Sequence, residues 1–163
     1  MAQKLRVLLD TNVYGYLLDQ AEREWVDSLR GSDQFVFYGF KVIRQELRAI
    51  PRHLLHGNRN YRSLALGLYD HLVKERGFGL DSLVEALAGE YARAYRGRVS
   101  KQKLRNDFLV VACATLHRLD ILVSDDEKTM LSGKAREAYR EVNKRFAWPQ
   151  PKFYTITEFR KRV

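Results

Sequence analysis

Short hydrophobic runs alternate along this chain with longer segments in which hydrophobic positions recur every three or four residues. A short run bounded by polar or turn residues is typical of a strand, and recurrence every three or four residues is typical of a helix. The predicted strands cover residues 5–9, 34–40, 121–124 and 152–156. The predicted helices cover residues 12–19, 22–30, 41–50, 61–76, 80–95, 103–119 and 135–146. Strands separated by helices predict a three-layer α/β/α fold around a central, mostly parallel sheet.

The middle of the chain, at about residues 52–98, is predicted to be a helical segment. Pro51 ends the helix before it, and Gly77 to Gly79 separate its two helices. No repeat or linker interrupts the sequence, and 163 residues are enough for one domain with its own hydrophobic core. We therefore expect a single domain over residues 1–163.

Acidic residues follow two of the predicted strands. Asp10 directly follows the run at 5–9, and Asp126 comes just after the run at 121–124. A buried carboxylate without a partner is costly, so Asp10 is expected to be exposed, paired or metal-bound. In a parallel sheet the ligand site lies beyond the carboxyl ends of the strands, which is where both acids are expected.

Two further acids lie in predicted helices. Glu46 belongs to the helix after the second strand, and Asp107 comes early in the helix at 103–119. Each acid also has a structural interpretation, because Asp10 or Asp126 can begin a helix, Glu46 can be a solvated surface residue, and Asp107 suits a helix N-terminus. Those four interpretations must all hold at once, whereas a single divalent-metal site accounts for the four acids together. We therefore predict a metal site.

The chemistry of phosphodiester hydrolysis explains why acids on separate elements would be needed. Mg²⁺ prefers oxygen ligands and keeps several of its waters, so a few carboxylates suit it better than a closed cage. One metal ion lowers the pKa of the attacking water, and a second stabilises the leaving oxygen. We predict Asp10, Asp107 and Asp126 as direct or water-mediated metal ligands. Glu46 is predicted to bind a second metal ion or to orient the water.

The charge of the chain points to a polyanionic partner. Lysine and arginine number 29 against 20 acidic residues, a formal net charge of +9, which favours binding to nucleic acid. The alternative is that the excess only keeps the protein soluble. Basic residues gather in two stretches, one around Glu46 and one just before Asp107. The residues expected to bring a phosphate backbone to the acids are Arg48, Arg52, Lys101 and Arg105.

Other classes of site and location are not favoured. Cys113 is the single cysteine and lies in a hydrophobic run, so we expect a buried thiol and no disulfide. The four histidines lack the paired spacing of a zinc site. The start of the chain is too short before Asp10 for a signal peptide, and no hydrophobic stretch approaches the ~20 residues of a membrane span. A cytoplasmic protein without a membrane partner is expected.

Several motifs together resemble the PIN-domain ribonucleases over essentially the whole chain. Residues 7–12 read VLLDTN, Glu46 follows the second strand, residues 106–114 read NDFLVVACA, and residues 121–127 read ILVSDDE. The resemblance implies an α/β/α domain that holds Mg²⁺ or Mn²⁺ and cuts RNA. Many members of the family are VapC-type toxins of toxin–antitoxin pairs, so an antitoxin protein is an expected partner and a homodimer the expected assembly.

The resemblance also bears on the residues around the acids. The last family motif reads Thr or Ser, any residue, Asp, which assigns its places to Ser124 and Asp126 and leaves Asp125 as an alternative ligand. Thr11, Asn12 and Ser124 have short polar side chains that can orient carboxylates or waters. Each of the three could instead cap a helix.

Two other enzyme classes place acids after parallel strands. A phosphoacceptor receiver domain needs an adjacent acidic pair near the first strand and a lysine after a late strand, and the sequence has neither at those places. A haloacid-dehalogenase-type phosphatase needs Asp-x-Asp after the first strand, where this chain has Asn12 at the second position. A housekeeping RNA-processing nuclease and a non-catalytic RNA-binding scaffold stay open as alternatives to the toxin, although a scaffold is expected to have lost acids that this chain keeps.

Overall fold

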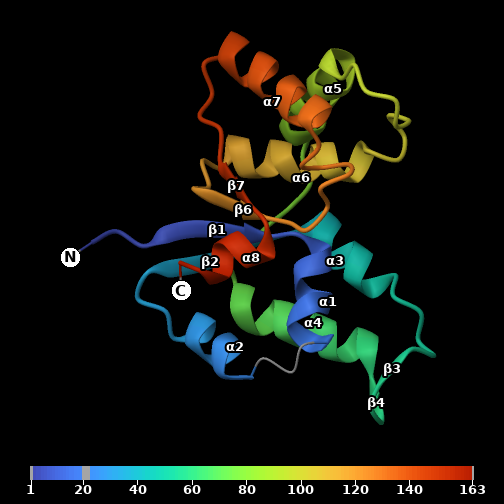
Figure 1. Ribbon diagram of the computed structural model, residues 1–163, viewed down its shortest axis with the longest axis vertical. Coiled ribbons are helices and arrows are strands. Elements are labelled where there is room, and N and C mark those ends of the chain that lie inside the picture. The colour runs from blue at the N-terminus through green and yellow to red at the C-terminus, as the bar shows by residue number, and fades with distance from the viewer. Residues whose placement is uncertain (1, 20–22, 163) are drawn as a thin grey trace.

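A parallel sheet forms the centre of the computed structural model, which describes residues 2–19 and 23–162. Within these residues the sheet has five strands in the order β5-β2-β1-β6-β7, and every neighbouring pair is parallel (Figure 1). The strands are β1 (Leu5–Leu9), β2 (Phe35–Phe40), β5 (Gly77–Phe78), β6 (Ile121–Val123) and β7 (Lys152–Tyr154). Their carboxyl ends therefore share one edge of the sheet.

Helices cover both faces of the sheet. Figure 1 shows one group above the sheet and a second group below it, which confirms the predicted three-layer α/β/α fold. The upper group is α5 (Ser82–Ala94), α6 (Arg105–Leu116) and α7 (Gly133–Arg145), in which α5 packs against the other two. The lower group is α1 (Thr11–Asp19), α2 (Arg23–Arg30), α3 (Lys41–Arg48) and α4 (Tyr61–Val73), and the short α8 (Ile156–Arg160) follows β7.

Burial explains why the central strands read as continuous hydrophobic runs. Val7, Leu8 and Leu9 of β1 are at most 1% exposed, because helices cover both faces of the strand. The helix α6 is similar, since every residue from Phe108 to Thr115 is buried. A helix that is apolar all round sits in the core rather than at its surface. Among the described residues, no helix is both long and apolar enough to cross a membrane.

Three parts of the chain differ from the sequence prediction. The glycines at 77 and 79 were expected only to separate two helices, but Gly77 and Phe78 form the edge strand β5 beside Gly39 and Phe40. A hairpin of two short antiparallel strands, β3 (Leu55–His56) and β4 (Arg59–Asn60), lies in the segment predicted to be helical. The last predicted strand ends at Tyr154, and α8 begins at Ile156 with Thr155 as its cap.

Helix boundaries also shift by a few residues. The fourth helix ends at Val73 rather than at residue 76, because Lys74 adopts a positive φ of 55°. The seventh begins earlier than predicted, where Ser132 accepts a hydrogen bond from the Ala135 amide. Glu22, the expected first residue of the second helix, lies outside the described residues, as do Met1 and Val163.

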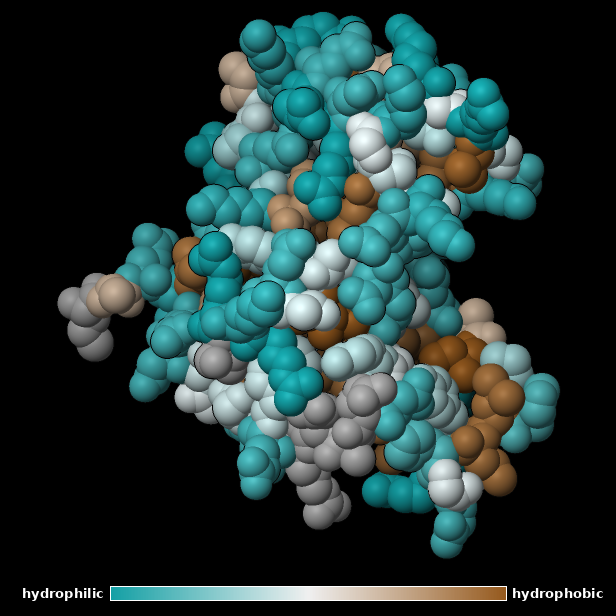
Figure 2. Space-filling model, viewed as in Figure 1, coloured by the Kyte–Doolittle hydropathy of each residue, from teal (hydrophilic) through white to brown (hydrophobic). Residues whose placement is uncertain are grey.

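One hydrophobic surface stands out on the face shown in Figure 2. Hydrophobic atoms gather there over the segment that leads from α3 into the hairpin, and two leucines of this segment are exposed. Leu54 is 43% and Leu55 62% exposed to solvent.

Candidate functional site

The structure brings the four predicted acids together at the carboxyl edge of the sheet. Asp10 directly follows β1, and Asp126 follows β6, the parallel neighbour of β1. Glu46 in α3 and Asp107 in α6 reach the same place because these two helices, from opposite layers, contact each other there. Each of the other three carboxylates interacts electrostatically with that of Asp10. Four separate elements thus build one acidic cluster.

Asp10 is the most buried member of the cluster, at 6% exposure. Its backbone amide donates to the Val123 carbonyl at 2.9 Å, which continues the pairing between β1 and β6 beyond Leu9. The Ser124 hydroxyl donates to Asp10 Oδ2 at 2.8 Å, and the Asn12 side-chain amide approaches the same oxygen at 3.4 Å. Burial raises the pKa of Asp10, and the bond from Ser124 offsets part of that rise. Ser124 and Asn12 therefore both hydrogen-bond to this carboxylate.

Glu46 and Asp107 have carboxyl groups that are hard to ionise. Burial raises the pKa of each to about 7, and the negative charge of Asp10 adds to the rise in both. Each group therefore keeps its proton to a higher pH than an exposed carboxyl group does. A bound cation would favour their charged forms, so this is the electrostatic setting that a metal ion would relieve.

Two threonines face the cluster with buried hydroxyls. The Thr11 hydroxyl approaches Glu46 and offsets part of the rise in its pKa, and the Thr129 hydroxyl does the same for Asp107. Neither hydroxyl oxygen has a hydrogen-bond partner of normal geometry among the described residues. Thr11 was among the predicted residues and Thr129 was not, although its position three residues after Asp126 is the spacing of a side-chain turn. The Thr129 amide does donate to Asp126 Oδ1, at 3.1 Å.

The neighbouring acids Asp125 and Asp126 point to different places. Asp125 Oδ1 accepts a hydrogen bond of 3.1 Å from the Ile156 amide, at the start of α8. Asp126 instead raises the pKa of both Asp10 and Asp107 through its charge. The carboxylate next to the other acids is therefore that of Asp126.

The donor set has the chemistry that a hard divalent cation prefers. The cluster offers carboxylate oxygens with hydroxyl oxygens beside them, and Mg²⁺ and Mn²⁺ favour oxygen ligands. In the described part of the chain, no three Asp, Glu, His or Cys side chains are already close enough to hold one ion. Ligation would therefore use waters or small side-chain movements, and Mg²⁺ commonly keeps several waters. The residues present fit such an ion on the chemistry of their donors.

The basic residues expected around the acids are dispersed. Arg48 lines a groove between α3 and α4, whereas Lys101 and Arg105 line a separate groove between α5 and α6. Arg52 is exposed in the segment after α3. These four residues therefore do not share one groove.

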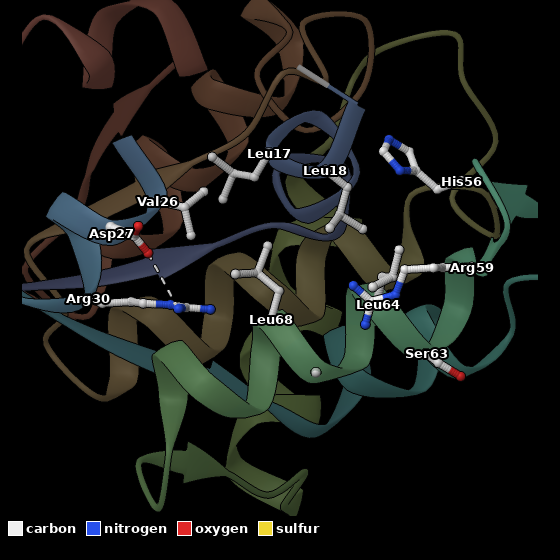
Figure 3. A pocket seen from close by; sticks show the side chains of 11 residues that line it. Leu17, Leu18, Val26, Asp27, Arg30, His56, Arg59, Ser63, Leu64 and Leu68 are labelled. Carbon is white, nitrogen blue, oxygen red and sulfur yellow. Dashed lines mark hydrogen bonds and ion pairs between the residues drawn. The ribbon is translucent and has the colours of Figure 1, made fainter. Parts of the chain in front are cut away.

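A large cavity in the described part of the chain is lined by none of the four acids. It measures about 730 Å³ and lies among α1, α2 and α4. Figure 3 shows leucines of α1 and α4 facing each other across it, and Arg30 bound to Asp27 at one rim, at 3.4 Å. The rim also includes Arg59 and His56. An apolar floor with a mostly basic rim suits an amphipathic segment better than a small polar substrate.

Comparison with known proteins identifies the fold. No family model and no curated protein sequence matches the chain. Solved structures do match. One shows VapBC2 from Rickettsia felis bound to a DNA fragment from its promoter, with 9% identity, a TM-score of 0.55, and coverage of 93% of this chain and 98% of the other. Another shows FitAB bound to an IR36 DNA fragment, with 20% identity, a TM-score of 0.57, and coverage of 91% and 94%. The chain therefore has a PIN-like fold of the VapC and FitB type, as its motifs predicted.

Proposed function

We propose that this protein is a Mg²⁺- or Mn²⁺-dependent endoribonuclease and the toxin of a type II toxin–antitoxin pair. The observation that carries the proposal is the cluster of Asp10, Glu46, Asp107 and Asp126, in which burial and mutual repulsion raise the pKa of Glu46 and Asp107 to about 7. Carboxyl groups with strongly raised pKa values occur most often at functional sites, where the perturbed ionisation serves the chemistry.

We assign the proposed roles from the contacts of each residue. Asp10, Asp107 and Asp126 would hold the cation, with Ser124 and Asn12 keeping Asp10 in one orientation. When bound, the cation would activate a water for attack on the phosphodiester and stabilise the leaving oxygen. Glu46 would bind a second cation or orient that water, and its pKa of about 7 suits a group that accepts a proton near neutral pH.

A partner protein is the second part of the proposal. VapBC2 and FitAB were each solved bound to a DNA fragment, and both structures share the fold of this chain. The cavity among α1, α2 and α4, with Leu18 and Leu64 in its lining, supports an amphipathic segment of an antitoxin as the occupant. A homodimer is the third part of the proposal. Leu54 and Leu55 expose hydrophobic surface that a second copy would cover, and the mass in solution, against 19.1 kDa for one chain, tests it.

Cleavage of end-labelled RNA with controlled metal content tests the nuclease. The purified protein should leave RNA intact in EDTA and cut it after Mn²⁺ or Mg²⁺ is restored. Tight RNA binding without cleavage in either metal would point to the non-catalytic scaffold instead. Arrest of growth on expression, relieved by the product of a small reading frame directly upstream, would separate the toxin from a housekeeping nuclease.

A further inference from the structure

A basic groove lies on the side of α3 that faces away from the acids. It has a volume of about 440 Å³ and runs between α3, the end of α4 and the edge strand β5. Among the described residues that line it are four cations and one carboxylate, Asp70, a net charge of +3. The cations of this basic groove are Lys41, Arg44, Arg48 and Lys74.

Helix geometry explains how α3 serves two sites. Successive residues turn by about 100°, so Lys41, Arg44 and Arg48 fall on one stripe of the helix. Glu46 lies about 200° from Arg44, on another side, where it meets Asp10 and Asp107. The basic groove and the acidic cluster are therefore the two sides of one helix. Both lie at the edge of the sheet where β1, β2 and β5 end, because Asp10, Lys41 and Gly79 directly follow these strands.

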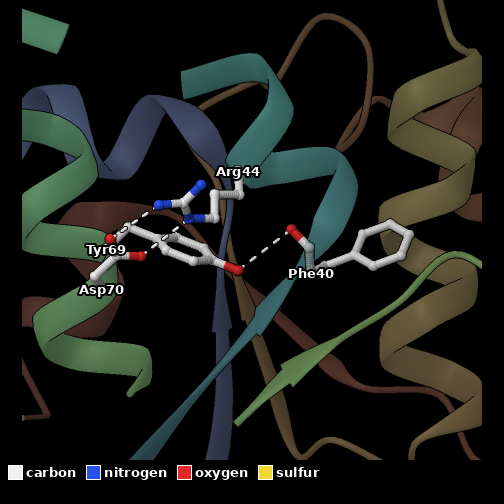
Figure 4. A network of polar contacts seen from close by, with 4 residues as sticks. All are labelled: Phe40, Arg44, Tyr69 and Asp70. Atoms are coloured by element: carbon white, nitrogen blue, oxygen red, sulfur yellow. Dashed lines mark hydrogen bonds and ion pairs between the residues drawn. The ribbon is translucent and has the colours of Figure 1, made fainter. Parts of the chain in front are cut away.

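The walls of the groove are held in place by polar contacts. Figure 4 shows Arg44 of α3 bound to Asp70 of α4, with Nε to Oδ1 and Nη2 to Oδ2 both at 3.0 Å. The Tyr69 hydroxyl donates to the Phe40 carbonyl at 3.3 Å, which ties α4 to the end of β2. Lys41, Arg48 and Lys74 make no ion pair with any described residue. Three cations of the groove are thus without an ion-pair partner among the described residues, while polar contacts hold the walls of the groove in place.

Lys74 occupies a backbone conformation that favours glycine. Its φ is 55° and its ψ is −121°, outside the regions in which residues with a Cβ are comfortable. Strain of this kind costs about 1–3 kcal/mol and is commonly retained for a functional reason. Glycine would occupy this position without strain, whereas lysine adds a cation to the lining of the groove.

We infer that the basic groove binds the phosphate backbone of single-stranded RNA beside the bond to be cut. The inference rests on the proposed ribonuclease function. The groove and the acids share helix α3, so a strand bound in the groove would continue to the acids. Backbone contacts from flexible cations position a strand without reading its sequence.

Gly79 offers a direct test. A Cβ built on this lining residue meets nothing within 4 Å, so a longer side chain can enter the groove without displacing packed atoms. Gly79→Glu adds a negative charge, and Gly79→Gln is the matched neutral control. Gly67→Glu is a control for charge alone, because Gly67 also has open space but lines the cavity on another side of α4.

Binding of fluorescent single-stranded RNA is measured in EDTA, and cleavage is measured separately in Mn²⁺. Gly79→Glu should weaken binding roughly tenfold relative to Gly79→Gln, because like charges repel across the groove. Gly67→Glu should leave binding within about twofold of the wild type. Lys74→Gly should raise the midpoint temperature of unfolding, weaken RNA binding, and make the salt slope less steep by about 0.7.

The outcomes separate this inference from the proposed function. If the wild type cuts RNA but Gly79→Glu binds and cuts like Gly79→Gln, the groove is not the RNA path and the nuclease stands. If the wild type neither binds nor cuts RNA, both proposals fail. If Gly79→Glu changes only the molar mass in light scattering, the groove is a protein interface and the inference is overturned.

Discussion

The Ser124 hydroxyl donates a 2.8 Å hydrogen bond to Asp10 Oδ2, which joins the ends of β6 and β1 at the centre of the acidic cluster. Ser124 is fully buried and also accepts a bond of 3.1 Å from the Asp126 amide. One hydroxyl therefore positions two of the acids.

Ser124→Ala should disturb both stability and activity. Loss of the hydroxyl leaves a buried carboxylate with one bond fewer, at a cost of about 1–3 kcal/mol. The cleavage rate should fall about tenfold even at temperatures where the variant is folded, because Asp10 is no longer held. Ser132→Ala is the control, since it removes the cap of α7 at a cost of ~1 kcal/mol. Equal cleavage rates for the two folded variants would contradict the positioning role.

Glu46 and Asp107 should make the folded protein less stable as the pH rises. Their pKa is raised to about 7 in the folded state, against ordinary values of 4.5 and 3.8. The folded state therefore binds more protons than the unfolded state between about pH 4 and 7, and the contribution of both groups to the free energy of unfolding falls across that window.

Thermal unfolding in EDTA at pH 5.5 and pH 8 measures this effect. Glu46→Gln and Asp107→Asn should each raise the midpoint temperature at pH 8 and change it less at pH 5.5. The rise at pH 8 should be about 2–4 °C for each kcal/mol gained. Glu141→Gln, on the exposed surface of α7, should leave the midpoint temperature unchanged at both pH values. A gain that is the same at both pH values would rule out ionisation as its cause.

Substitution of Asp125 and of Asp126 should have different effects on the affinity for Mn²⁺. Asp126→Asn should weaken Mn²⁺ binding in calorimetric titration and strongly slow cleavage, because its carboxylate belongs to the cluster. Asp125→Asn should bind Mn²⁺ nearly as well as the wild type, since its carboxylate is engaged with the Ile156 amide. The reverse order of affinities would give the ligand role to Asp125.

The cavity among α1, α2 and α4 should be required for the partner but not for cleavage. Leu64→Glu places a charge on its apolar lining and should abolish co-purification with the product of the upstream reading frame. Leu83→Glu changes a leucine that is 55% exposed on α5, and should leave the complex intact. A complex that survives Leu64→Glu would place the partner elsewhere.

Much of this arrangement could be predicted from sequence because strand ends carry strong signals. The run at 121–124 and the run before Asp10 are hydrophobic on both faces, and parallel strands necessarily share a carboxyl edge. The meeting of their acids follows from that topology. The reach of Glu46 and Asp107 to the same edge could be predicted only through the family resemblance, because it depends on how α3 and α6 pack.

Other features had weak signals or none. The strand β5 has two residues, one of them glycine, which is too short for a hydrophobic pattern. The strained backbone of Lys74 depends on the turn between α4 and β5, and no sequence pattern predicts its positive φ. The separation of Arg48 from the acids was available in principle, since two residues along a helix differ by about 200°. Proximity in sequence was there a poor guide to proximity in space.

The single-turnover cleavage rate of RNA in saturating Mn²⁺ tests the central claim most directly. It is compared between the wild type and the double variant Asp10→Asn, Asp107→Asn, after circular dichroism has shown that both are folded. The account predicts that the wild type cuts and that the double variant loses at least about 10³-fold in rate, as expected when metal ligation is removed. Undiminished cleavage by the folded double variant would show that the acidic cluster is not the active site.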